Sequence, residues 1–374
     1  MQGMGNDQCM HIVHFDLPDI NDSIGGGGPW RTFEVNRRIA RIHPVTVVTS
    51  RWAGLADEEE RDGVHYLRIG KAARYPRNVP AYFRAIPAAL WHLPHDLVVE
   101  DFAPPWSVFF TPFYTRKPVI ASVQYIYTDL LEKEYHLPFG MVERMGYRLY
   151  HHFVALPPAV PYIRARNAKA DIHTTTNGID QRAFDYCGLP EDDAICYLGR
   201  IDYYPKGLDL LFAAFAKIAP TCQTRLRMLG DGNDLPMVRQ TVQQMGLADR
   251  VDFLGRIDGP ERFRLVGTSK IVCQPSRRET FSLASAEALA VGRPLVAFDM
   301  PDLSYNGDVA AVVPCYDVDA YAAKLQFLLE HPEARAALSE KGRTHARRYK
   351  WDDVAAAQLA YYEKVMVDHR VAAG

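Results

Sequence analysis

The stretch Gln274-Pro-Ser-Arg-Arg-Glu-Thr-Phe-Ser-Leu-Ala-Ser-Ala-Glu-Ala-Leu-Ala-Val-Gly-Arg-Pro294 decides the fold of the second half of this chain. It starts at the end of a predicted strand, passes through a loop that carries Glu279, and continues as a predicted helix over residues 282–291. Gly292 is suited to end this helix, and Pro294 precedes the next predicted strand. A strand, a loop, a helix and another strand in this order indicate a parallel sheet with helical crossovers.

Two carboxylates lie on either side of this helix start. Glu279 precedes the helix, and Glu287 lies one to two turns inside it. The first amides of a helix have no partner within the helix and form the positive end of its dipole, so those of Phe281, Ser282 and Leu283 are candidate donors to phosphate oxygens. The carboxylates are suited to accept hydrogen bonds from sugar hydroxyls. The alternative is that Glu279 only complements the helix dipole and that Glu287 is a surface residue.

Short β-rich runs alternate with helical patterns along the whole chain. These runs are nearly continuous in apolar residues, as expected for strands that are covered on both faces. We expect an α/β protein with two consecutive parallel sheets and a change from one to the other near residues 174–180. The predicted strands are 11–15, 45–49, 64–69, 96–100 and 118–123 in the first half, and 194–198, 225–229, 251–254, 271–274 and 294–298 in the second.

Composition excludes several classes of protein. The 374 residues carry 43 basic and 45 acidic side chains, a formal net charge of −2, which gives no global basic field for nucleic acid. No run of about 18 apolar residues is present, and the first ten residues are polar, so we expect a cytoplasmic protein. The six scattered cysteines form no C-x-x-C pair and the histidines show no metal spacing. We expect Asp317 and Asp319 to start a helix, because aspartate is a common helix cap, and we expect no metal site.

Two cations follow the first strand of the second half. Arg200 and Lys206 lie six residues apart. The planar fork of arginine and the mobile charge of lysine together suit a diphosphate. The alternative is that each is a solvated surface cation.

A glycine run follows the first strand of the chain. Gly26, Gly27 and Gly28 precede Pro29, which favours a first helical turn. Such a helix start favours phosphate, although the run lacks the third glycine of a dinucleotide fingerprint. The alternative is a flexible loop without a ligand.

Taken in order, four segments resemble the C-terminal half of the GT-B enzymes of glycosyltransferase family 4 (glycosyl transferases group 1). The resemblance implies the GT-B fold, two Rossmann-like parallel-sheet domains that face each other across a cleft. It implies an acceptor-side domain over 1–178, a nucleotide-sugar domain over 179–351, and a last helix, 352–374, that packs back on the first domain. The segments are Leu198-Gly-Arg with Lys206-Gly, Met228-Leu-Gly-Asp-Gly, Phe253-Leu-Gly-Arg and residues 274–294; Asn177-Gly-Ile-Asp180 resembles the element at the domain boundary.

The resemblance also implies a function. It implies a retaining transfer of sugar from a UDP- or GDP-linked donor to an unidentified acceptor hydroxyl, without a metal or other cofactor. Glu279 would contact the donor sugar, and Arg200 and Lys206 would hold the diphosphate as further catalytic residues. Glu287 would contact the ribose, and the amides of Phe281, Ser282 and Leu283 would contact phosphate oxygens. The backbone near Arg256 and Ile257 would border the base. The loop of Gly26, Gly27 and Gly28 would also contact the donor.

The chain departs from the family at two places. Glu279-Thr-Phe-Ser282 stands where members commonly have E-G-F-G, and Gln124 stands where many have histidine. The alternatives are a nucleotide-sugar 2-epimerase or hydrolase on the same fold, or a partner subunit without turnover. The cation pair combined with the two glutamates favours the transferase.

Two segments of the first half contain no acidic residue. One lies between Gly63 and His95 and includes Arg68 and Arg84, and the other covers 144–170. Cations interleaved with aromatic residues suit an anionic membrane surface, which predicts peripheral contact through the N-terminal domain at the inner face of the membrane. They equally suit an anionic soluble acceptor, and the third alternative is a pair of solvated faces.

Overall fold

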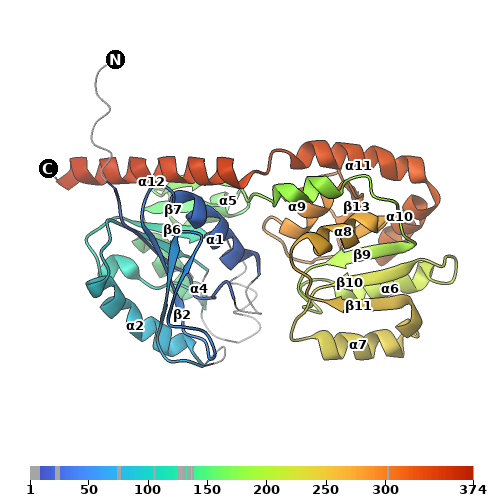
Figure 1. Cartoon of the computed structure of the whole chain (residues 1–374), viewed down its shortest axis with the longest axis horizontal. Helices are drawn as coiled ribbons and strands as arrows, with labels where there is room; N and C mark the ends of the chain where they lie inside the picture. Colours follow the sequence, from blue (N-terminus) through green and yellow to red (C-terminus); the bar gives the residue numbers. More distant parts are fainter. Residues whose placement is uncertain are drawn as a thin grey trace, which may run out of the picture. The chain divides into compact units, whose positions relative to one another are not determined.

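The computed structural model describes residues 9–21, 26–73, 77–103, 107–124, 126, 128, 132, 136, 139–300 and 303–373. It divides into two units, shown in Figure 1. Unit 1 comprises Met1–Thr176 and Trp351–Gly374, and unit 2 comprises Asn177–Lys350. The chain therefore leaves unit 1 once and returns to it with its last helix.

Unit 1 is built on a mostly parallel sheet. Its described strands have the order β3-β4-β2-β1-β5-β6-β7-β8, and only the β3–β4 pair is antiparallel. The strands are β1 (Ile12–Phe15), β2 (Val45–Ser50), β3 (Glu58–Arg61), β4 (Val64–Ile69), β5 (Leu97–Asp101), β6 (Val119–Val123), β7 (His152–Ala155) and β8 (Asp171–Thr174).

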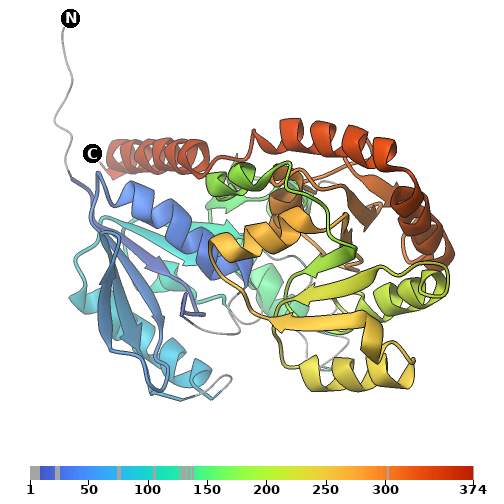
Figure 2. The same ribbon diagram turned by 45° about the vertical axis from the view of Figure 1, so that its right-hand side comes forward.

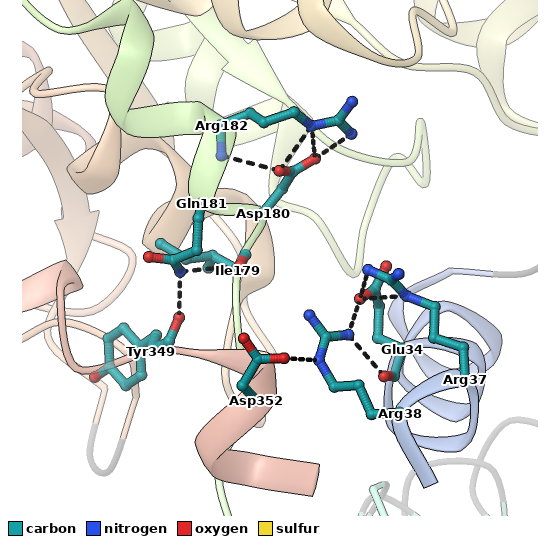
Figure 3. Close-up of polar contacts among 9 residues, drawn as sticks. All are labelled: Glu34, Arg37, Arg38, Ile179, Asp180, Gln181, Arg182, Tyr349 and Asp352. Atoms are coloured by element: carbon teal, nitrogen blue, oxygen red, sulfur yellow. Dashed lines mark hydrogen bonds and ion pairs between the residues drawn. The ribbon is translucent and has the colours of Figure 1, made fainter. Parts of the chain in front are cut away.

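The last helix of the chain packs on the first. Helix α12 lies beside α1, as Figure 1 and Figure 2 both show. Arg38 of α1 donates from Nε to Asp352 of α12 at 2.5 Å and from Nη1 to Glu34 at 2.5 Å (Figure 3). The helices of this unit are α1 (Gly27–Ile39), α2 (Val79–His92), α4 (Phe139–Leu149), α5 (Ala159–Arg166), α12 (Trp351–Ala373) and the short 3-10 helix η1 (Thr111–Phe113).

Unit 2 is built on a fully parallel sheet. Its described strands have the order β11-β10-β9-β12-β13-β14, the 3-2-1-4-5-6 order of a Rossmann sheet. The strands are β9 (Ala194–Leu198), β10 (Arg225–Leu229), β11 (Val251–Gly255), β12 (Ile271–Gln274), β13 (Leu295–Phe298) and β14 (Ala311–Val313). The order reverses between β9 and β12, which lie side by side in the middle of the sheet.

Helices connect these strands. Asp317 caps α10 by accepting the amide of Ala320 at 2.9 Å, as the sequence predicted. The helices are α6 (Leu208–Ile218), α7 (Leu235–Gln244), α8 (Pro260–Thr268), α9 (Leu283–Ala290), α10 (Val318–Glu330) and α11 (Pro332–Ala346), with the 3-10 helices η2 (Gln181–Tyr186) and η3 (Ala248–Arg250).

The ten predicted strands are confirmed within one residue at either end, because most of them are nearly continuous apolar runs. Four strands were not predicted. Strand β3 consists of charged residues at the sheet edge, β14 has three residues, and β7 and β8 have four residues each. These strands are too short or too polar to stand out from the surrounding sequence.

The two segments that join the units pair with each other. The amide of Ile179 donates to the carbonyl of Tyr349 at 3.1 Å, and the same carbonyl accepts Gln181 Nε2 at 3.2 Å (Figure 3). Ile179 also forms a parallel bridge with Lys350. The chain thus enters and leaves unit 2 at neighbouring points.

Arg68 lies inside unit 1 and not on its surface. Its Nε donates to Asp19 at 2.7 Å, and its terminal nitrogens contact Glu59 at 2.7 Å and the carbonyl of Ala56 at 2.8 Å. The side chains of Arg68 and Asp19 are both fully buried. The interpretation of Arg68 as one of the surface cations between Gly63 and His95 is therefore wrong. The guanidinium group of Arg68 binds a carboxylate from a distant part of the sequence, and the local sequence does not indicate this pairing.

We predict that Arg68→Ala lowers the free energy of unfolding of unit 1 by about 3–5 kcal/mol, because it leaves Asp19 as an uncompensated buried charge. The five tryptophans of the sequence all fall in the residue ranges of unit 1, so denaturant unfolding followed by tryptophan fluorescence reports on this unit. The control is Arg84→Ala on the exposed side of α2, expected to change stability by no more than about 0.5 kcal/mol. Equal effects of the two variants would contradict the buried pair.

Candidate active site

The strand order of unit 2 brings two loops together. In open parallel sheets, ligands bind beyond the carboxyl ends of the strands, at the point where the strand order reverses. In unit 2 this point lies between β9 and β12. The loop after β9 carries Arg200 and Lys206, and the loop after β12 carries Glu279.

Lys206 and Glu279 form an ion pair across this point. Lys206 Nζ lies 2.6 Å from Glu279 Oε1, and the side chains are 22% and 11% exposed. The same oxygen accepts hydrogen bonds from Gln274 Nε2 at 2.8 Å and from Ser276 Oγ at 2.9 Å. Gln274 also donates to Ser276 at 2.8 Å, so the carboxylate is held by a connected polar network. The carboxylate is thereby oriented before any ligand binds.

The two loops approach each other closely at Gly207. A Cβ atom there would lie 2.0 Å from the carbonyl oxygen of Pro275, and the φ of Gly207 is +61°. Only glycine accommodates both the contact and the left-handed conformation. The Lys206 side chain is therefore placed by a direct contact between the backbones of the two loops.

The residue before α9, Ser282, has a strained backbone conformation. Its φ is 65° and its ψ is 81°, in the left-handed region that glycine favours. Its Oγ contacts the hydroxyl of Ser285 at 2.6 Å. Ser304 donates its side chain to the carbonyl of Ser282 at 3.0 Å and its amide to the carbonyl of Phe281 at 3.0 Å. These contacts hold the backbone of the helix start.

The same helix start is suited to bind an anion. The first turn of α9 contains no acidic side chain. Its first amides point out of the helix without intrahelical acceptors, and the dipole adds positive potential there. Leu283 begins the helix, so the three predicted amides, of Phe281, Ser282 and Leu283, lie at this end.

Glu287 lies inside unit 2 and not on its surface. Its side chain is 10% exposed, and Arg262 Nη2 of α8 lies 2.8 Å from its Oε1. Burial raises the pKa of Glu287, and Asp180 acts in the same direction, whereas the Arg262 guanidinium opposes the shift. The carboxylate is thus held in one position by a cation from another helix.

The other predicted cations of unit 2 are more exposed. Arg200 contacts Asp202 at 2.6 Å, and Arg256 contacts Asp258 at 3.1 Å. The carbonyl of Arg200 accepts the hydroxyl of Tyr197 at 2.7 Å, which fixes the backbone of this loop. Ile257 is partly buried beside Arg256.

The glycine run belongs to unit 1. Gly26 precedes α1, and Gly27 and Gly28 form its first turn. A Cβ atom at Gly26 or Gly28 would meet no described atom within 4 Å. Steric packing within the described residues therefore does not explain these glycines. The described residues contain no group of three or more His, Cys, Asp or Glu side chains arranged to hold a metal ion.

Sequence reasoning did not predict three partners in the site. Gln274 and Ser276 hold Glu279, and their positions at the end of a strand and within five residues of Glu279 were a usable signal. Arg262 lies on α8, and no spacing in the sequence relates it to Glu287. Only the packing of α8 near α9 brings the two together.

The candidate site lies in a part of the chain that matches a known protein family. Residues 188–345 match the family model of glycosyl transferases group 1. The matched residues lie within unit 2. They include Lys206, Glu279, α9 and Arg262.

Two curated relatives cover only part of the chain. The D-inositol 3-phosphate glycosyltransferase of Jonesia denitrificans is 31% identical over 228 residues, which are 54% of this chain and 54% of that protein. The phosphatidyl-myo-inositol mannosyltransferase of Mycolicibacterium smegmatis is 30% identical over 199 residues, 50% of this chain and 51% of that one. The chain spans about half the length of the curated relatives that it matches.

Solved structures resemble the whole chain in fold. Sucrose-phosphate synthase from Thermosynechococcus elongatus has a TM-score of 0.78 at 19% identity, over 96% of this chain and 100% of that one. HepE from Anabaena, solved in complex with UDP and glucose, has a TM-score of 0.72 at 16% identity, over 95% and 99%. The predicted GT-B fold class, with two parallel-sheet Rossmann-like domains, is confirmed.

We predict that Ser282→Gly is more stable than Ser282→Ala by about 1 kcal/mol, because both lose the hydroxyl contacts but only alanine keeps the left-handed strain. Amide hydrogen exchange of peptides from α9 measures this difference as an opening free energy. Elsewhere in helices glycine is less stable than alanine, so the expected order is the reverse of the usual one. Equal protection in the two variants would contradict the strained conformation.

Proposed function

We propose that this protein transfers a sugar from a UDP- or GDP-linked donor to an acceptor hydroxyl, with retention of anomeric configuration. The observation that carries the proposal is the Lys206–Glu279 ion pair at the strand-order reversal of unit 2, one short loop before the start of α9. The match to the group 1 family model covers the same residues.

The diphosphate would bind between a cation and a helix end. Lys206 supplies a mobile positive charge, and the amides near Leu283 supply hydrogen bonds to phosphate oxygens. Arg200, on the same loop as Lys206, adds a second cation. Because negative charge grows on the diphosphate as the glycosidic bond breaks, these groups stabilise the transition state more than the bound donor.

Two carboxylates would recognise the hydroxyl groups. Glu279 is held by Gln274 and Ser276, so it offers an oriented acceptor to the donor sugar. Glu287, held by Arg262, would accept hydrogen bonds from the ribose. The backbone near Arg256 and Ile257 would border the base.

The reaction requires no side chain as general base. The acceptor hydroxyl attacks the anomeric carbon through an oxocarbenium-like transition state while the nucleoside diphosphate leaves. The hydroxyl proton passes to an oxygen of the departing phosphate, so the products are the glycoside and the protonated nucleoside diphosphate. Lys206 and the start of α9 would stabilise that leaving group.

The names of related proteins guide the choice of probes. HepE has been solved with UDP-glucose, and relatives are named mannosyltransferase and D-inositol 3-phosphate glycosyltransferase. A donor screen therefore starts with UDP-glucose and GDP-mannose. Acceptors with a cyclic polyol, with and without a phosphate group, form the first acceptor set.

We predict that Glu279→Ala lowers kcat/KM by about 30-fold or more, the loss of roughly 2 kcal/mol of hydrogen bonding to a charged group. Lys206→Ala is expected to lower kcat on the order of 100-fold, with a smaller change in KM. Glu287→Ala is expected to weaken UDP or GDP binding by about tenfold. Release of nucleoside diphosphate and calorimetric binding of the nucleotide measure these effects.

The same assay separates the alternatives. Nucleotide release without acceptor indicates a hydrolase, a changed donor sugar without transfer indicates an epimerase, and nucleotide binding without release indicates a partner subunit. Assays in EDTA are expected to retain activity. Near-wild-type kcat/KM in Glu279→Ala and Glu287→Ala would reject the site.

A contact of unit 1 with an anionic membrane surface is part of the proposal. On α4, Met141, Arg144, Met145 and Arg148 lie at helical spacing on one exposed face, and the two methionines are 60% and 55% exposed. The acidic residue of this helix, Glu143, is buried against Tyr162. Exposed apolar side chains between cations suit an anionic bilayer. Of the described helices, none is long and apolar enough to cross a membrane.

We predict that Arg144→Gln with Arg148→Gln weakens binding to anionic liposomes by about 30-fold, since each cation near the surface contributes about 1 kcal/mol. The matched control, Arg77→Gln with Arg84→Gln, removes the same charge from the other acid-free segment. Sedimentation with anionic and zwitterionic liposomes, at low and high salt, is the measurement. An equal loss in the control, or no salt-sensitive binding by the wild type, would reject the α4 surface.

A further inference from the structure

Arg277 links the two loops of the site. It lies on the loop that carries Glu279, two residues before it. Its backbone amide donates to the carbonyl of Pro205 at 3.0 Å, and its Nη1 donates to the carbonyl of Tyr204 at 2.9 Å. Both acceptors belong to the loop that carries Lys206.

The guanidinium group of Arg277 is itself held rigidly. It donates to the two carboxylate oxygens of Asp209 at 2.6 and 2.7 Å, a bidentate pair. Its carbon lies 4.0 Å from the ring centre of Tyr204 and 5.8 Å from that of Tyr316. The Arg277 side chain is 12% exposed and that of Asp209 is 30% exposed.

Asp209 lies in the first turn of α6, directly after the Lys206 loop. Arg277 therefore contacts this loop at Tyr204 and Pro205, and it contacts the helix that follows the loop at Asp209. The close approach of Gly207 to the carbonyl of Pro275 leaves the loop little room to shift. The residues on both sides of Lys206 are thus held by contacts from the Glu279 loop.

We infer that Arg277 is a positioning residue that holds Lys206 beside Glu279 for the leaving diphosphate. The inference rests on the proposed function, since it assigns Arg277 a role at that same site. A lysine at position 277 keeps the charge but not the planar fork, so it cannot contact both oxygens of Asp209 and the carbonyl of Tyr204 together. Arg277 acts through Lys206 and touches no reacting atom.

The first test compares Arg277→Ala and Arg277→Lys with the wild type. Both variants are expected to lower kcat by at least tenfold while the Kd for UDP or GDP changes less than about threefold. Unchanged kcat in Arg277→Ala overturns the inference.

The second test is a double-mutant cycle with Lys206→Ala. If Arg277 acts through Lys206, Arg277→Ala changes kcat less than twofold when Lys206 is already absent. An independent, multiplied loss in the double variant overturns the inference, because it would show a structural effect that does not depend on Lys206.

The chain provides a matched control in Arg225. This residue also forms a bidentate pair, with Asp252 at 2.7 and 2.5 Å, and donates to the carbonyl of Asp249 at 2.6 Å. It lies on β10, outside the two loops of the site. Arg225→Ala is expected to leave kcat within twofold of the wild type. A loss equal to that of Arg277→Ala would mean that any such pair is required for folding, which overturns the specific role.

A third measurement needs no substrate. Lys206 is partly covered and bonded to Glu279, so its acylation by an amine-reactive reagent, followed by peptide mass spectrometry, reports on its placement. Arg277→Ala is expected to raise the rate at Lys206 about tenfold, and Arg225→Ala is expected to leave it unchanged. An unchanged rate in Arg277→Ala overturns the inference. A raised rate without turnover on any donor supports the positioning role and rejects the proposed transferase.

Discussion

The ion pair between Lys206 and Glu279 depends on the order of the strands in unit 2. The two residues lie 73 positions apart in the sequence. Strands β9 and β12 are nevertheless neighbours, so the loops that follow them begin at the same edge of the sheet. A parallel sheet in which the order reverses places the two following loops on either side of one point. The charged pair occupies that point in this chain, and the start of α9 follows on the same loop as Glu279.

Close backbone packing makes this arrangement stiff. Gly207 allows one loop to touch the carbonyl of Pro275, and Gly230 allows the turn after β10 to approach the carbonyl of Gly199. Ser282 adopts a conformation that glycine would adopt more easily, and Ser304 holds it there through two backbone carbonyls. Strain of this kind persists only where surrounding contacts outweigh it, and such positions are common at functional sites. Ser282, at the last position of E-G-F-G, thus has a backbone conformation that glycine favours and adds hydroxyl contacts.

In unit 1, several charged residues of the sequence are buried and do not contribute to the charge of the surface. Arg68 lies in a segment without acidic residues, but it is fully buried against Asp19. Glu143 has two arginines as near neighbours on α4, but it turns inward to Tyr162 and Arg166. The inward carboxylate leaves an outer face of methionine and arginine. Which charges meet solvent is therefore decided by packing and not by their number in a window of sequence.

The sequence by itself determined the class of the fold and the elements that carry the site. Continuous apolar runs such as 194–198 and 271–274 mark buried parallel strands, and Gly292 with Pro294 marks the end of α9, because these signals are local. Only the tertiary structure decided which side chains meet. Glu287 with Arg262, Asp209 with Arg277 and Arg68 with Asp19 join different elements, and nothing in the spacing of the residues encodes the distances between them. Burial makes such pairs specific, since a charge removed from water must find a partner wherever the chain supplies one.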